Sequence, residues 1–183
     1  MRHFLLVVLL TASTFSQSAT MTDNTGLILS KEQKAMRMTR LTDVQGNDVV
    51  LKHQPGQVSI IHFWATWCAP CRQELPLLIT LANKLHPHGL RVITVAADSH
   101  QSVRDYPDLH SLPQPVLIDQ YGAALRDYGV QGLPSSYVVN HSGKIKYIAT
   151  GQIDWNKKQL IDLLKTLLMD QQHDRLGAIG NFE

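Results

Sequence analysis

Cysteine is scarce in this sequence: the 183 residues include only Cys68 and Cys71. A closed zinc site takes four ligands. The sequence has no second cysteine pair and no H-x-x-x-H run that could complete such a set. We therefore predict no metal site. Net charge is also low, at +2 from 17 basic and 15 acidic residues, with no basic stripe. This charge distribution argues against a nucleic-acid partner.

Long hydrophobic runs are missing as well. The apolar run at residues 4–10 is far shorter than the ~20 residues that span a bilayer. It follows the basic start Met1-Arg2-His3 and precedes a small, polar stretch, which is the pattern of a secretory signal. We predict a signal peptide over residues 1–19 and an exported protein, periplasmic or otherwise extracytoplasmic. Whether the segment is cleaved or stays as a membrane tether is left open, because the small-x-small sites are imperfect.

Internal repeats and low-complexity linkers are absent too, so the length predicts one domain with its own core. Residues 58–64 and 90–97 read as buried strands, joined by a helical pattern. This is a βαβ unit, and an antiparallel pair of strands follows within residues 136–150. Asp154 is expected to cap a last helix with leucines at helical spacing. We predict an α/β domain over residues 36–169 and a flexible tail over 170–183.

The two cysteines stand where the first buried strand ends and a helix begins. Cys68 at a helix start would meet free N–H groups that favour a thiolate, and Cys71 lies one turn further on the same face. A purely structural bridge over so short a loop would contribute only about 2 kcal/mol. The pattern therefore predicts a working dithiol.

Two stretches identify a family resemblance. Residues 63–76 read FWATWCAPCRQELP and residues 128–137 read YGVQGLPSSY, followed by Gly143-Lys144-Ile145. Found together in this order, they resemble the thioredoxin superfamily, and within it the exported TlpA/ResA-type thiol-disulfide oxidoreductases. The resemblance implies a three-layer fold with a central mixed sheet flanked by helices. It also implies an extra helix and strand inserted at about residues 98–119.

The family pattern carries roles onto matching residues. It implies that Cys68 is the attacking thiol and Cys71 the resolving one, with no cofactor beyond the Cys68–Cys71 disulfide. It implies further that Trp67, Leu133 and Pro134 contact the client, and that Pro134 follows a cis peptide bond. On base rates alone a plain turn at Pro134 would be favoured, since few X-Pro bonds are cis.

Two further candidate residues, Glu74 and His62, accompany the dithiol. Glu74 lies three residues after Cys71; partly buried there, it would have a raised pKa and could exchange protons with Cys71. The alternative is a solvated glutamate in the first helical turn. His62 lies six residues before Cys68, where thioredoxins carry a buried acid. It is either a core histidine bonded to the backbone or a proton relay, because imidazole titrates near neutrality.

We predict an exported enzyme that reduces disulfides of client proteins and is re-reduced by a membrane electron donor. It is expected to act as a monomer in cell redox homeostasis. Three alternatives compete with this prediction. A disulfide oxidase of the same fold would run the same chemistry in reverse. A copper-handling protein would use the thiolates and a histidine as soft ligands, but its cysteines are usually spaced by three. A peroxidase would need a lone cysteine in another loop.

Overall fold

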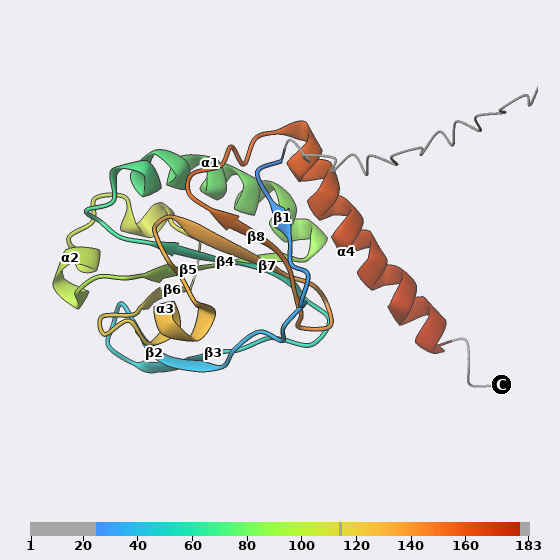
Figure 1. Ribbon diagram of the computed structural model, residues 1–183, viewed down its shortest axis with the longest axis horizontal. Coiled ribbons are helices and arrows are strands. Elements are labelled where there is room, and N and C mark those ends of the chain that lie inside the picture. Colours follow the sequence, from blue (N-terminus) through green and yellow to red (C-terminus); the bar gives the residue numbers. More distant parts are fainter. Residues whose placement is uncertain (1–24, 114, 180–183) are drawn as a thin grey trace, which may run out of the picture.

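The computed structural model describes residues 25–113 and 115–179. Within these residues, eight strands form one mixed sheet in the order β1-β8-β7-β4-β5-β6-β2-β3 (Figure 1). The strands are β1 (Ile28–Leu29), β2 (Thr39–Asp43), β3 (Asp48–Leu51), β4 (Val58–Trp64), β5 (Leu90–Ala96), β6 (Val116–Ile118), β7 (Ser135–Val139) and β8 (Ile145–Thr150). The helices are α1 (Ala69–Leu85), α2 (His100–Arg104), α3 (Ala123–Tyr128) and α4 (Lys158–Ile179), with single 3-10 turns η1 (His86–His88) and η2 (Leu109–Ser111).

Helices cover both faces of this sheet, as the three-layer prediction required. One core cluster joins α1 and α4 to β4, β5, β7 and β8. A second cluster packs α3 and the β2–β3 hairpin against the opposite face. Figure 1 shows the same division, with α1 and α4 on one side of the sheet and α3 on the other. The predicted α/β architecture is confirmed.

Strand β4 carries the chain to the site. All seven of its residues are buried. Strand β5 pairs with it in parallel on one side and β7 antiparallel on the other, and core clusters cover both faces of the sheet. Alternate side chains of β4 therefore enter different layers. Ile60, His62 and Trp64 face α1, whereas Ile61 and Phe63 enter the α3 layer. The near-continuous apolar sequence of β4 follows from this double burial.

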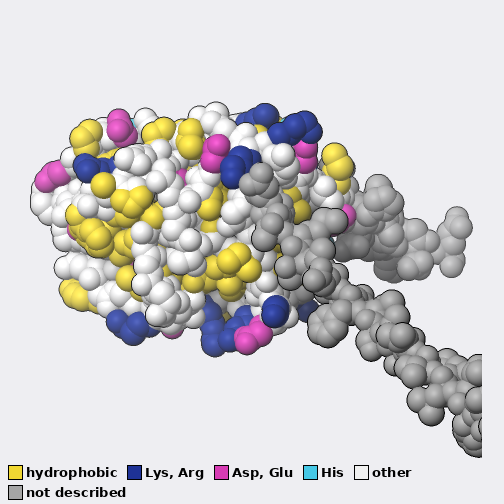
Figure 2. Space-filling model, turned by 45° about the horizontal axis from the view of Figure 1, so that its top comes forward, with side chains coloured by type: hydrophobic (Ala, Val, Ile, Leu, Met, Phe, Trp, Pro, Cys, Tyr) yellow, Lys and Arg dark blue, Asp and Glu magenta, His cyan; other side chains and the backbone are white. Residues whose placement is uncertain are grey.

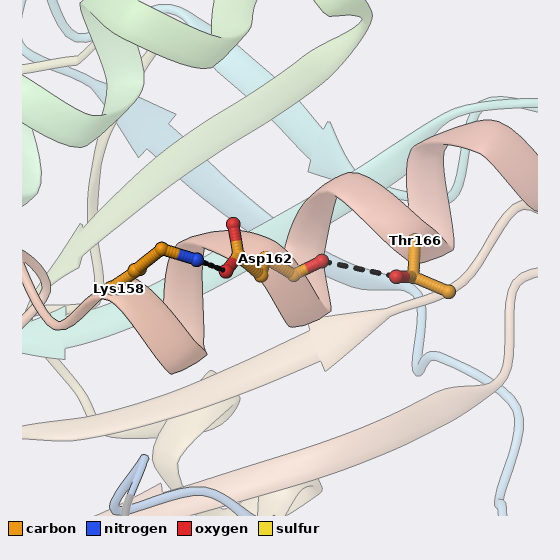
Figure 3. Close-up of polar contacts among 3 residues, drawn as sticks. All are labelled: Lys158, Asp162 and Thr166. Carbon is orange, nitrogen blue, oxygen red and sulfur yellow. Dashed lines mark hydrogen bonds and ion pairs between the residues drawn. The ribbon is translucent and has the colours of Figure 1, made fainter.

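Helix α4 closes the layer behind α1. Its buried side chains repeat at helical spacing and are Leu160, Leu164, Leu167 and Leu168. On its outer face Lys158 pairs with Asp162 at 2.5 Å, and the Thr166 hydroxyl donates to the Asp162 carbonyl at 3.1 Å (Figure 3). These i,i+4 contacts are exposed, so the ion pair contributes little to stability.

The structure corrects several sequence expectations. Asp154 does not cap α4: its side chain accepts from the Asn156 backbone and its carbonyl from Lys157, forming a turn before the helix starts at Lys158. Strand β1 lies before the expected domain start at residue 36, and α4 runs through residues 170–179 of the expected tail. Flexibility of that tail stays a prediction. The signal-peptide prediction falls on residues 1–19, outside the described part of the chain. Among the described residues, no helix combines the length and apolar character needed to cross a bilayer.

Candidate active site

Cys68 and Cys71 form a disulfide at the start of α1, with their Cα atoms 5.3 Å apart. Cys68 is the N-cap residue: its carbonyl accepts from the Arg72 backbone, and its Sγ accepts from the Cys71 backbone N–H at 3.3 Å. Pro70 occupies the first turn, where a missing N–H leaves no bond unmade. Cys68 therefore meets the positive end of the helix dipole, which stabilises a thiolate on reduction.

The two sulfur positions differ in access. Cys68 retains 5% of its surface exposed, whereas Cys71 is fully buried. The adjoining Trp67 is 69% exposed, and Leu133 packs against the cluster that contains both cysteines. The Leu133–Pro134 bond is cis, as expected. Figure 2 shows hydrophobic side chains gathered at the end of the molecule where α1 begins. The structure thus places Leu133 against the dithiol cluster, beside the cis bond to Pro134, with Trp67 exposed next to Cys68.

Glu74 lies one turn beyond Cys71 on the buried face of α1 and is fully buried rather than partly so. Its Oε1 accepts a hydrogen bond from the Trp155 indole Nε1–H at 2.5 Å, and its Oε2 has no hydrogen-bond partner among the described residues. Burial raises the pKa of Glu74 to about 7, although the Trp155 and Ile153 hydrogen bonds act to lower it. A carboxyl with such a pKa can give or take a proton near neutral pH.

His62 faces the same layer from β4 and is fully buried. Its Nδ1 lies 2.9 Å from the Ser136 hydroxyl of β7, so its partner is a side chain and not the backbone that we expected. Its Nε2 has no partner among the described residues. Burial lowers the pKa of His62 to about 3, so the ring is neutral at physiological pH. The assumption that it titrates near neutrality was wrong.

Sequence reasoning missed three contacts around this site. Trp155, the partner of Glu74, carried no motif that could have flagged it. Asp98 Oδ2 accepts from the Thr66 hydroxyl at 2.6 Å and the Thr66 backbone at 3.1 Å, which ties the loop before Cys68 to the end of β5. Burial acts to raise the pKa of Asp98, but hydrogen bonds from Thr66 and Ser99 hold it below its ordinary value. Tyr106, from the 98–119 insertion, packs edge-on against Trp64 at 5.0 Å.

A hollow of about 380 Å³ adjoins the start of α1, lined by Ala69, Arg72, Gln73, Tyr106, Pro107 and Asp108. A larger one, of about 820 Å³, lies near η1 at the far end of α1. Neither hollow is lined by a cysteine, but the smaller one reaches Ala69, the residue that follows Cys68. Over the described ranges, no three His, Cys, Asp or Glu side chains are grouped so that they could hold a metal ion.

Comparison with known proteins agrees with this geometry. A model of the AhpC/TSA family matches residues 32–148. The thiol-disulfide oxidoreductase ResA of Bacillus thuringiensis subsp. konkukian is 33% identical over 128 residues, covering 69% of this chain and 73% of that protein. The chain belongs to the AhpC/TSA family, as a thiol-disulfide oxidoreductase of the ResA type. A thioredoxin-like protein of Bacillus subtilis, YneN, is 35% identical over 124 residues, covering 66% and 71%.

Solved structures place this oxidoreductase in the thioredoxin-like fold. The crystal structure of StoA from Bacillus subtilis matches with a TM-score of 0.56 at 24% identity, covering 72% of this chain and 96% of that one. A thiol:disulfide interchange protein from Chlorobium tepidum matches with a TM-score of 0.62 at 23% identity, covering 74% and 97%. These two likenesses show the fold. The family's activity implies that the partners of this protein are client proteins that carry disulfides.

Proposed function

We propose that this oxidoreductase works outside the cytosol as a reductase of client-protein disulfides, with Cys68 attacking and Cys71 resolving. The greater exposure of Cys68 and its N-cap position are the observations that carry this assignment. The basic and apolar start of the sequence supports export. Outside the cytosol a dithiol stays reduced only if electrons are supplied, so the proposal includes a membrane-bound donor.

The reaction starts from the reduced protein. Cys68 thiolate attacks one sulfur of the client disulfide, forming a mixed disulfide and releasing the other client sulfur as a thiolate that takes up a proton. The helix N-terminus keeps Cys68 ionised for this step, because the Cys71 backbone N–H points at its Sγ. Cys71, fully buried, is shielded from the client disulfide.

Resolution then transfers two electrons to the client. Cys71 loses its thiol proton to the Glu74 carboxylate and attacks Cys68 Sγ, which releases the second client thiolate and forms the Cys68–Cys71 disulfide. The position of Glu74 one turn beyond Cys71 and its pKa near 7 support this role. When the donor dithiol reduces the protein, Glu74 returns the proton to Cys71 as that sulfur leaves.

His62 is assigned a lesser part. A ring with a pKa near 3 does not store a proton at neutral pH. It can relay a proton only by accepting one at one ring nitrogen while it releases another from the second nitrogen. Ser136 contacts Nδ1, so Nε2 is the nitrogen available for a second donor or acceptor. We assign His62 this relay beneath the dithiol.

Client binding is assigned to the exposed surface around the disulfide. Trp67 offers an apolar ring with a polar edge beside Cys68. Leu133, from the loop before β7, packs against the cluster that contains both cysteines, and Pro134 follows it in the chain. No cofactor beyond the disulfide is needed, since the thiol exchange balances by itself, and a monomer suffices because every proposed group comes from one chain.

The reduction potential of the Cys68–Cys71 pair tests the direction of this proposal. Purified protein is equilibrated with glutathione or dithiothreitol buffers, and the reduced fraction is counted by alkylation and mass shift. We expect a value near the ~−270 mV of thioredoxin. A value near the ~−120 mV of DsbA would support an oxidase instead.

A further inference from the structure

Trp155 makes a buried hydrogen bond that has no part in the reaction proposed above. It lies in the loop between β8 and α4, outside every sequence motif of the redox site. Its ring is fully buried in the cluster that contains Ile60, Leu78 and Leu160. Its indole Nε1–H donates to Glu74 Oε1. A residue in the second half of the chain therefore holds the carboxyl that lies one helical turn beyond Cys71.

The chemistry of the indole fixes where the Glu74 proton resides. An indole N–H donates and cannot accept, so Glu74 Oε1 must be an acceptor in both protonation states. In the neutral acid the carbonyl oxygen is the stronger acceptor and pairs with the indole, which places the proton on Oε2, the oxygen without a hydrogen-bond partner among the described residues. We propose that Trp155 is a positioning residue of the redox site, which orients the Glu74 carboxyl so that Oε2 is the atom that exchanges the proton with Cys71. This rests on the proposed role of Glu74.

The same hydrogen bond sets the pH range in which Glu74 works. Burial favours the neutral acid, whereas the indole and the Ile153 backbone N–H favour the carboxylate. The other titratable groups facing this layer among the described residues are His62, which is neutral here, the Cys71 thiol after reduction, and Tyr147 of β8, which packs against the same core cluster as Trp155. Asp154, beside Trp155 in sequence, is exposed. Removing the indole N–H should therefore raise the pKa of Glu74 further.

The unmodified oxidised protein allows a direct test by NMR. The chain has three indoles, at Trp64, Trp67 and Trp155. The Trp155 indole N–H resonance should move with pH around a midpoint near 7, and this movement should disappear in Glu74→Gln. Trp64 is the internal control, because its buried Nε1 has no hydrogen-bond partner among the described residues. A Trp155 resonance that does not follow the Glu74 titration overturns the inference.

Kinetics give the second test. Trp155→Phe keeps an aromatic ring but removes the donor, and should move the pH midpoint of thiol-disulfide exchange upward by about one unit, a tenfold change in the acid constant of Glu74. The same substitution in a Glu74→Gln background should shift nothing, because Trp155 acts through Glu74. Leu160→Val removes a methylene group from the same core cluster and alters no polar group. It should leave the pH midpoint of thiol-disulfide exchange unchanged.

The outcomes separate this inference from the proposed function. If Glu74→Gln alone leaves the pH profile of exchange unchanged, the proton-transfer role of Glu74 fails. If Glu74→Gln changes the profile and Trp155→Phe does not, Glu74 stands and the positioning role of Trp155 fails. Should Trp155→Phe not fold, the NMR titration of the unmodified protein decides.

Discussion

Replacing Glu74 by glutamine should change how the stability of the oxidised protein depends on pH. The ordinary pKa of 4.5 applies to Glu74 in the unfolded chain, and burial raises it to about 7 in the fold. Between these values the folded state holds a proton that the unfolded chain has released. Stability therefore falls as pH rises through this window, by about 3 kcal/mol for a shift of this size.

His62 works in the opposite direction. Its pKa is lowered from 6.5 to about 3, so the unfolded chain binds a proton that the folded ring refuses. Stability therefore rises with pH through that window, by about 5 kcal/mol as an upper bound. The two windows overlap between about pH 4.5 and 6.5, where the slopes nearly cancel in the unmodified protein. Glu74→Gln removes the fall of stability with pH that Glu74 causes, so the rise of stability with pH that His62 causes becomes measurable.

Urea unfolding of the oxidised protein at several pH values from about 4.5 to 8 measures this directly. The amide that Glu74→Gln introduces can still accept from the Trp155 indole, but it buries a new N–H₂ group, so the absolute stability at one pH is not diagnostic. The difference in unfolding free energy, Glu74→Gln minus unmodified, should grow by about 3 kcal/mol over the range. A difference that stays constant would show that Glu74 titrates as a solvated carboxylate, which would refute the buried-acid reasoning.

Three further substitutions test separate parts of the site. His62→Asn should flatten the loss of stability on acidification from about pH 6.5 towards 3, read from the same unfolding curves; an unchanged acid limb would contradict the buried neutral ring. Thr66→Val should cost about 1–3 kcal/mol in urea unfolding, because Asp98 loses its hydroxyl donor; no loss would mean that the Thr66–Asp98 contact is incidental. Trp67→Ala should lower kcat/KM for a protein client severalfold while leaving the urea midpoint unchanged, since the ring is exposed; equal turnover would remove Trp67 from the client surface.

Strand β4 and the start of α1 could be predicted because their signals are local. Seven consecutive buried residues left a near-continuous apolar run, and Pro70 after Cys68 marked a helical first turn. The motif around the cysteines also placed Glu74 on the correct helix face. Local periodicity and turn chemistry were enough for these elements.

The features that the sequence did not predict depend on tertiary contacts. The Trp155–Glu74 bond joins the loop before α4 to the second turn of α1, two segments that only the folded domain brings together. Strand β1 spans two residues and shows no periodicity, so its pairing with β8 left no pattern to read. Asp154 resembled an N-cap, but its side chain is used in a turn with Asn156. The low pKa of His62 depends on its burial, which the sequence indicated. It depends also on the lack of a charged partner within the described part of the chain, which the sequence could not indicate.

The division of labour between the two cysteines is the central claim, and trapping tests it most directly. Reduced Cys71→Ser and Cys68→Ser proteins are each mixed with a disulfide-bearing client such as insulin, and the products are separated without reductant. Cys71→Ser should accumulate a mixed disulfide through Cys68, because attack proceeds and resolution cannot. Cys68→Ser should form almost none, because Cys71 is fully buried. Accumulation through Cys71 in place of Cys68 would reverse the roles, and full client reduction by either variant would contradict a mechanism that needs both thiols.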